Sequence, residues 1–170
     1  MTPKRLPAWL RPAPGSLVAS ALQHGKSPWA DAVHVLWSMW IFITPLFARS
    51  GYDARWVALT LLSYPLFLLL YAKVLLAPPR TAYRYALAMV ALSMALLPWY
   101  PSGMSYFVFG CVLLHTSPAR SLAGYAAGLL ALNAAFIAEA LAIGYPWQMV
   151  VWLPMVTLIV GFIVHVERLN

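Results

Sequence analysis

Six long apolar stretches, separated by short breaks that contain proline, glycine or charged residues, dominate the hydrophobic pattern of the chain. Each stretch is continuously apolar and lacks the alternation of a barrel strand, which predicts helices. A basic, proline-rich segment, residues 1–26, precedes them. The predicted helices are Pro28–Ala48, Trp56–Leu76, Tyr85–Tyr100, Met104–Thr116, Arg120–Ile143 and Trp147–Val166.

The composition indicates that these helices lie in a membrane. Of the 170 residues, 63% are hydrophobic and 9% are charged, whereas a soluble domain is about 45–50% apolar and about 25% charged. We therefore expect an all-α polytopic membrane protein, a bundle of six transmembrane helices. Residues 27–166 form its transmembrane domain, and residues 167–170 begin a cytoplasmic signalling helix.

The basic residues predict the orientation of this bundle. With six spans, nine Lys and Arg residues fall on the side of the N-terminal segment, and only Arg49 and Arg55 fall on the other. Because Lys and Arg concentrate on the cytoplasmic side, both termini are expected in the cytoplasm. The net charge of +7 is thus explained by topology, and we expect no nucleic-acid partner.

The sequence contains no recognisable catalytic or metal-binding pattern. The lone cysteine, Cys111, falls in an apolar run, and glycine-rich phosphate loops and paired carboxylates are lacking. We expect no catalytic residue, metal or cofactor, and whether the chain is part of an enzyme stays open. The sequence has four histidines, which lack the spacing of metal ligands: His24, His34, His115 and His165. Of these, His115 and His165 are expected at cytoplasmic helix ends.

Two polar side chains, Asn133 and Glu139, are predicted inside the fifth helix. An acidic group at the bilayer centre costs about 2.5–3.5 kcal/mol on insertion scales. The two residues either clamp a packing seam or form a ligand- or proton-responsive site. A stripe of small residues on the same helix predicts a close helix–helix contact; it comprises Gly124, Gly128, Ala131, Ala135, Ala138 and Ala142.

The last helix has features of a signal-transmitting element. A heptad-type seam runs out of the membrane along Ile159, Phe162, Val166 and Leu169, and Pro154 predicts a hinge. We expect Pro154, Phe162, Val166 and Leu169 to carry the movement. Lys26 and Asp31, at the cytoplasmic edge of the first helix, either anchor it at the interface or register hydration as the bilayer changes thickness.

The third and fourth predicted helices are short. They have 16 and 13 residues, or about 24 and 20 Å at 1.5 Å per residue, against a hydrocarbon core about 30 Å thick. Short spans thin the bilayer locally, at a cost of fractions of a kcal/mol per Å. The pattern therefore favours sensitivity to bilayer thickness.

Three strings of aromatic and flanking residues stand out along the predicted helices. They are an aromatic first helix with Trp37, Trp40, Phe42, Pro45 and Phe47, the run Ser105-Tyr106-Phe107-Val108-Phe109, and Trp152-Leu153-Pro154 leading to Glu167-Arg168. These strings resemble the membrane sensor region of DesK-type sensor histidine kinases, the thermosensor class of two-component systems, and the resemblance covers about residues 29–170. It implies an input domain that governs a dimeric histidine kinase in the bacterial cytoplasmic membrane.

The family's kinase machinery has no counterpart in this sequence. His165 lies at the membrane edge without the phosphoacceptor motif. The expected partners are therefore the lipid bilayer, a second copy of the chain, and a kinase core with its response regulator, in cis or in trans. The alternatives are a small transporter or channel subunit, which needs a polar path, and an intramembrane enzyme, which needs a catalytic pair.

Overall fold

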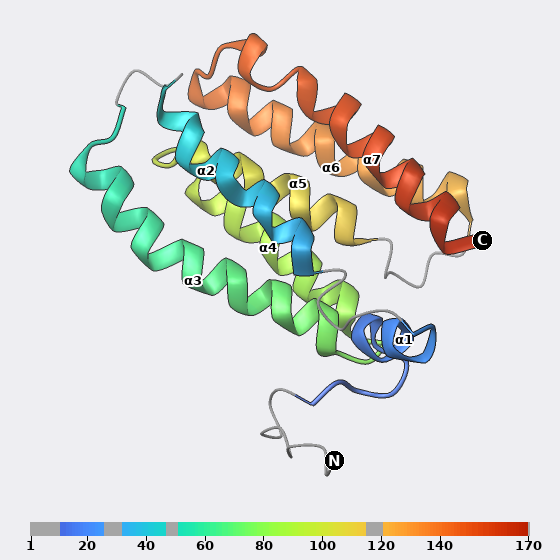
Figure 1. The fold of residues 1–170 in the computed structure, drawn as a ribbon. Helices are drawn as coiled ribbons and strands as arrows, with labels where there is room; N and C mark the ends of the chain where they lie inside the picture. Colours follow the sequence, from blue (N-terminus) through green and yellow to red (C-terminus); the bar gives the residue numbers. More distant parts are fainter. Residues whose placement is uncertain (1–10, 26–31, 47–50, 115–120, 170) are drawn as a thin grey trace.

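The computed structural model describes residues 11–25, 32–46, 51–114 and 121–169, and every regular element in these ranges is a helix (Figure 1). The helical fold class is thereby confirmed for the described part of the chain. The elements in chain order are α1 Leu17–Gln23, η2 Ala32–Met39, α2 Trp40–Ile43, η3 Thr44–Leu46, α3 Ala54–Leu76, α4 Ala82–Leu96, η4 Pro101–Gly103, α5 Met104–Leu113, α6 Leu122–Ile143, η6 Trp147–Met149 and α7 Trp152–Leu169.

Three helical stretches are long and apolar enough to cross a membrane: Ala54–Leu76, Leu122–Ile143 and Trp147–Val166. Three shorter apolar helical stretches accompany them, namely Leu36–Leu46, Ala82–Leu96 and Pro101–Leu113. Large apolar side chains also cover the outside of the bundle; Leu61 and Leu62 of α3 are 70% and 74% exposed. An apolar exterior of this extent is typical of a surface that faces lipid. The structure therefore supports a membrane protein.

Local sequence signals determine where the long helices begin. The Asp53 carboxylate accepts a hydrogen bond from the Trp56 backbone N–H at 2.8 Å and caps α3. The Ser121 hydroxyl accepts one from the Gly124 N–H at 3.0 Å and caps α6. Both are preferred N-cap residues, because their side chains satisfy an N–H that has no intrahelical partner. Gly144 ends α6 in the left-handed conformation, with φ of +106°.

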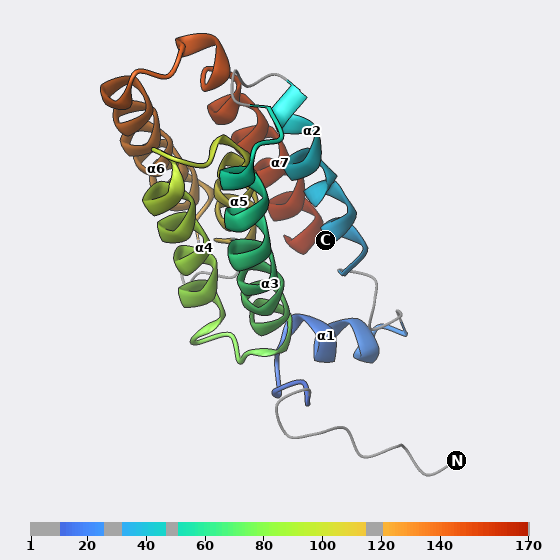
Figure 2. The same cartoon turned by 90° about the vertical axis from the view of Figure 1, so that its left-hand side faces the viewer.

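The η2–α2–η3 segment and helices α3 to α7 run alternately in opposite directions, so that their connections gather at two ends (Figures 1 and 2). We call the end that carries residues 51–53, 97–100 and 144–146 the distal end, and the opposite one the α1 end. Helix α1 lies across the α1 end, where the Ala13 N–H donates to the Leu76 carbonyl oxygen at 2.9 Å.

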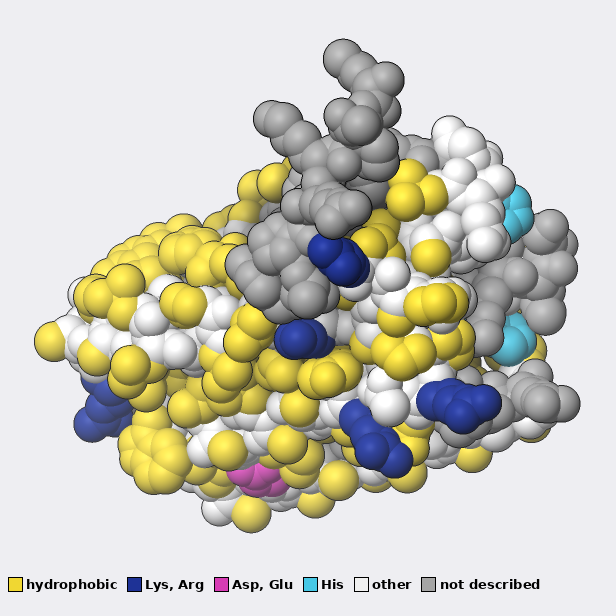
Figure 3. Space-filling view, turned by 90° about the horizontal axis from the view of Figure 1, so that it is seen from below, with side chains coloured by type: hydrophobic (Ala, Val, Ile, Leu, Met, Phe, Trp, Pro, Cys, Tyr) yellow, Lys and Arg dark blue, Asp and Glu magenta, His cyan; other side chains and the backbone are white. Residues whose placement is uncertain are grey.

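Basic residues are unequally divided between the two ends. Arg11, Lys73, Arg80 and Arg84 lie on elements at the α1 end, whereas Arg55, at the start of α3, lies at the distal end. Figure 3 shows several Lys and Arg side chains on the lower face of the molecule, over a surface that is otherwise largely hydrophobic. The described residues thus keep the asymmetry that the sequence predicts.

Helices α4 and α5 approach each other closely at one glycine. A Cβ atom added to Gly110 of α5 would lie 2.7 Å from Val90 Cγ2 and 2.8 Å from the Ala86 carbonyl oxygen of α4. The Ala86 carbonyl group belongs to the helix backbone, which cannot move aside as the end of a flexible side chain can. Glycine at this position therefore sets the separation of the two short helices.

We expect Gly110→Ala to lower the free energy of unfolding by about 1–3 kcal/mol, because the extra methyl group overpacks the α4–α5 contact. The matched control is Gly128→Ala on α6, where an added Cβ has nothing within 4 Å and where alanine is the better helix former. Unfolding in mixed micelles measures both. Equal losses for the two variants would show that Gly110 has no special packing role.

Candidate functional site

The turn between α4 and α5, residues 97–103, is folded into the bundle. Leu97 and Tyr100 are fully buried, and Ser102 is 1% exposed. Two hydrogen bonds hold its backbone: the Ser93 hydroxyl donates to the Gly103 carbonyl oxygen at 2.6 Å, and the Tyr145 hydroxyl donates to the Leu97 carbonyl oxygen at 2.5 Å. Buried carbonyl groups need such partners, since unpaired ones are costly.

Polar side chains tie this turn to the neighbouring helices. The Trp56 indole N–H donates to Ser102 Oγ at 2.9 Å, and Ser102 Oγ in turn donates to the Ile41 carbonyl oxygen at 2.8 Å. Two further pairs link α3 to the turn and to α5: Thr60 Oγ1 lies 2.6 Å from the Tyr100 hydroxyl, and Ser63 Oγ lies 2.8 Å from the Tyr106 hydroxyl. We call this set the distal polar cluster; its members are Trp56, Thr60, Ser63, Tyr100, Ser102 and Tyr106.

Burial raises the pKa of Tyr100, and it raises the pKa of Tyr145 to about 12. A free phenol is already neutral at physiological pH, so both side chains act as neutral hydrogen-bonding groups. The Tyr100 and Tyr106 side chains are both fully buried.

Helix α7 is joined to the bundle at two places, of which the first is polar. Asn133 Nδ2 of α6 donates to Thr157 Oγ1 of α7 at 2.9 Å and to the Leu129 carbonyl oxygen at 2.8 Å. Thr157 Oγ1 donates to the Leu153 carbonyl oxygen at 2.9 Å. Asn133 Oδ1 is buried without a hydrogen-bond partner. Asn133 therefore links α6 to α7 and keeps one buried acceptor without a partner.

The second joint lies near the α1 end and is formed by one aromatic ring. The Tyr125 hydroxyl of α6 donates to the Cys111 and Val112 carbonyl oxygens at 3.3 Å each. A Cβ atom on Gly161 of α7 would lie 2.9 Å from that hydroxyl. The Tyr125 ring also stacks on His165, with ring centroids 5.9 Å apart. Helices α5, α6 and α7 meet on this tyrosine.

The residues predicted to transmit a signal occupy different environments. Pro154 lies in the first turn of α7, where the missing N–H breaks no intrahelical hydrogen bond. The structure therefore gives no reason for a hinge inside the helix at Pro154. Phe162 is 53% exposed and lies with Ile159 along an apolar groove of about 390 Å³ between α6 and α7.

The other predicted residues do not form one site. Val166 is exposed on the last turns of α7, and the side chain of Leu169 is outside the described residues. Asn133 is buried, whereas Glu139 is only half-buried. Lys26 and Asp31 also lie outside the described residues. Among the residues that the structure describes, no group of three His, Cys, Asp or Glu side chains is placed to hold a metal ion.

The small-residue stripe of α6 faces outward. Gly124 and Gly128 are both exposed, as are the alanines in register with them. Within the described bundle they do not pack against another helix, and the predicted close helix–helix contact stays a prediction. Helix α6 instead uses the face with Tyr125, Leu129 and Asn133 to contact α7.

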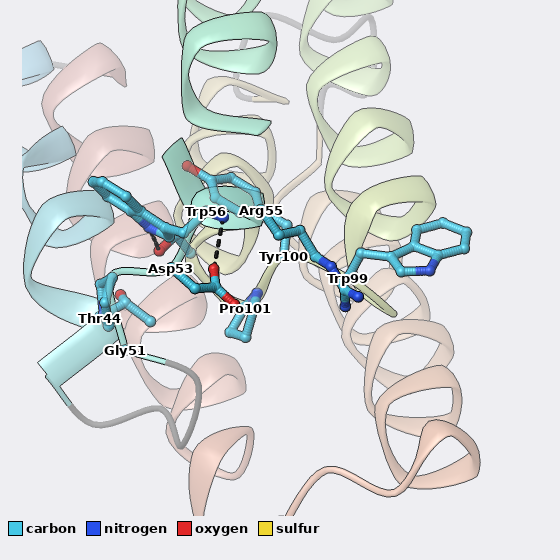
Figure 4. A pocket seen from close by; sticks show the side chains of 10 residues that line it. Thr44, Gly51, Asp53, Arg55, Trp56, Trp99, Tyr100 and Pro101 are labelled. Carbon is cyan, nitrogen blue, oxygen red and sulfur yellow. Dashed lines mark hydrogen bonds between the residues drawn. The ribbon is translucent and has the colours of Figure 1, made fainter. Parts of the chain in front are cut away.

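A small cavity opens at the distal end, beside the polar cluster (Figure 4). Its volume is about 40 Å³, and its lining includes Asp53, Arg55, Trp56, Trp99 and Tyr100. The cavity brings a carboxylate, a guanidinium and aromatic rings together. Spacing in the sequence does not reveal it, because Trp99 and Tyr100 are more than forty residues from Asp53.

No protein-family model, curated protein or solved structure matches the chain. Function is therefore argued from the geometry described above.

We expect Tyr100→Phe to lower the free energy of unfolding by about 0.6–1.7 kcal/mol, the range for one side-chain hydrogen bond between membrane helices. The variant removes the bond to Thr60 and keeps the ring. Tyr83→Phe is the control, since the half-buried Tyr83 phenol on α4 has no partner among the described residues. Thermal unfolding in detergent compares them, and a Tyr83→Phe loss as large as that of Tyr100→Phe would contradict the expectation.

The Asn133–Thr157 bond is tested by a double-mutant cycle of Asn133→Leu and Thr157→Val. We expect a coupling energy of about 0.6–1.7 kcal/mol. The double variant is expected to be less destabilised than the sum of the single variants, because either single change already removes the bond between the two side chains. Strictly additive losses in the unfolding free energy would mean that this bond does not hold α7 to α6.

Proposed function

We propose that the chain is the membrane-embedded input domain of a two-component histidine kinase, a multi-pass protein of the bacterial inner membrane. Six helices would cross the bilayer: the η2–α2–η3 segment, α3, α4, η4–α5, α6, and η6–α7. The resemblance of the aromatic strings to DesK-type sensors supports this assignment. The kinase core and the response regulator are then partners, in cis or in trans, and the kinase acts as a dimer.

The charge distribution supports an orientation with the α1 end in the cytoplasm. Arg11, Lys73, Arg80 and Arg84 belong to this end, and Arg55 belongs to the other. Basic residues near the ends of spans are retained on the cytoplasmic side. Both termini would therefore be cytoplasmic, and α7 would deliver its end to a cytoplasmic module.

The observation that carries the proposal is the unequal attachment of the helices. Hydrogen bonds of the distal polar cluster lock α2, α3 and α5 to the turn at 97–103. Helix α7 has one side-chain hydrogen bond to another helix, through Thr157, among the described residues. Its outer face is exposed at Ile159, Phe162 and Val166. Because α7 packs against α5 and α6 but takes no part in the distal polar cluster, it is the helix that we expect to move relative to the rest.

Bilayer thickness is the stimulus that the helix lengths favour. Helix α4 has 15 residues and α3 has 23, or about 22 and 34 Å at 1.5 Å per residue. Both helices are held in one bundle, so no single bilayer thickness matches the lengths of both. A change of about 2 Å felt by several helices shifts an equilibrium by roughly 1–3 kcal/mol. Membranes thicken on cooling, which connects this stimulus to thermosensing.

The transporter alternative receives no support from the polar residues. The distal polar cluster lies in the distal half of the bundle, and the core toward the α1 end is lined by Phe67, Val74 and other apolar side chains. Glu139 lies on a different face of α6 from Asn133, so the two residues do not form part of one polar path through the bundle. Substrate flux in liposomes that is abolished by Glu139→Ala would favour transport instead.

The proposed function is tested by fusing this chain to a histidine kinase core and reconstituting it in vesicles of graded acyl-chain length. Autophosphorylation is expected to change with chain length. Asn133→Leu is expected to shift the thickness of half-maximal output, because it removes the polar tie between α6 and α7. Leu62→Ala, at a lipid-exposed position of α3, is the control. Output that is the same in every vesicle would refute thickness sensing.

A further inference from the structure

The cavity at the distal end carries two opposite charges on residues close in the chain. Asp53 and Arg55 flank the start of α3, and in Figure 4 the Asp53 carboxylate lies by Pro101 while the Arg55 side chain extends toward Trp99. One carboxylate oxygen, Oδ1, accepts the Trp56 N–H at 2.8 Å. Within the described part of the chain, no ion pair joins Asp53 to Arg55. Both charges are thus available to a ligand.

The surroundings of the carboxylate favour a cation. The Trp56 and Tyr100 side chains line the same cavity, and the faces of such rings attract an ammonium group. The Asp53 carboxylate adds the opposite charge. Arg55 is exposed at the rim, where a guanidinium can donate two parallel hydrogen bonds to a phosphate.

Hydrogen bonding selects the kind of cation that suits this cavity, whose volume is about 40 Å³. A primary ammonium donates N–H hydrogen bonds to a carboxylate such as that of Asp53, whereas a trimethylammonium has no N–H to donate. The ligand therefore places a primary ammonium at Asp53 and its anion at Arg55.

We propose that the distal cavity binds a phosphoethanolamine headgroup, with the ammonium at Asp53 and the phosphate at Arg55. The source is a phospholipid of the surrounding leaflet. This step rests on the proposed placement of the distal end at a membrane surface. Tyr52 and Trp99, which are 53% and 57% exposed beside the cavity, are of the residue types that gather at the headgroup level.

Occupancy of this cavity acts on the distal polar cluster. Tyr100 and Ser102 line the cavity and also bond to α3 and α2. A headgroup that binds the folded arrangement stabilises it by mass action. The lipid would therefore reinforce the frame against which α7 moves.

The test measures lipid retained by the full chain after purification from nanodiscs of equimolar phosphatidylethanolamine, phosphatidylcholine and phosphatidylglycerol. Native mass spectrometry is expected to show several-fold preference for phosphatidylethanolamine. Asp53→Asn keeps the helix cap, because Asn caps as well as Asp, and is expected to lose the preference, as is Arg55→Gln. Arg84→Gln, which removes an exposed arginine at the α1 end, is expected to retain it.

Equal retention of the three lipids by the native chain would overturn the proposal, and so would an undiminished preference in Asp53→Asn. A separate arm adds free O-phosphoethanolamine to the chain in phosphatidylglycerol nanodiscs. If the free compound raises the unfolding temperature and phosphatidylethanolamine does not, the lipid source is wrong. None of these readouts uses kinase output, so failure here is distinct from failure of thickness sensing.

Discussion

A chain reversal that is buried at the edge of a membrane must satisfy its own peptide groups, and the turn at residues 97–103 imposes this constraint on the bundle. Pro98 and Pro101 supply no N–H, which reduces the number of donors to be paired. The Tyr100 N–H donates to the Leu96 carbonyl oxygen at the end of α4, and the Gly103 N–H donates to the Tyr100 carbonyl oxygen. The Tyr145 hydroxyl donates a hydrogen bond to the Leu97 carbonyl oxygen, and the Ser93 hydroxyl donates one to the Gly103 carbonyl oxygen. The polar residues of several helices are thereby explained by one turn.

The same constraint ties several elements of the bundle together. Side chains that serve the turn come from α3, α4 and the segment after α6, so these elements cannot shift without breaking buried hydrogen bonds. Helix α7 supplies none of these side chains. It packs against α5 and α6, where the Asn133–Thr157 bond and the Tyr125 contact with Gly161 position it, and its Ile159 and Phe162 side chains are exposed. The proposed function assigns the movement to α7.

The sequence predicts the helical segments well, because continuous apolar runs and capping residues are local signals. The predicted helices Trp56–Leu76 and Arg120–Ile143 overlap α3 and α6, which Asp53 and Ser121 cap. Side-chain partnerships are not local. The approach of Thr60 to Tyr100 depends on how α3 packs against a turn forty residues away, and no periodicity encodes it.

Two predictions depend on packing that the sequence does not encode. Small residues such as Gly124 and Gly128 suit both a close helix contact and an outward face, and the packing of α6 on α7 turns them outward. Pro154 lies in the first turn of α7, which begins at Trp152 and where proline is well tolerated, so the hinge there stays a prediction.

Distances between spin labels test most directly whether α7 moves against a fixed frame. In a Cys111→Ala background, one pair is placed at Thr81 and Val166, and a second at Ala54 and Pro98 within the distal end. As the acyl chains of the surrounding vesicles are lengthened, the first distance is expected to change and the second to stay constant. If both distances stay constant, or both change together, the separation into frame and movable helix is wrong.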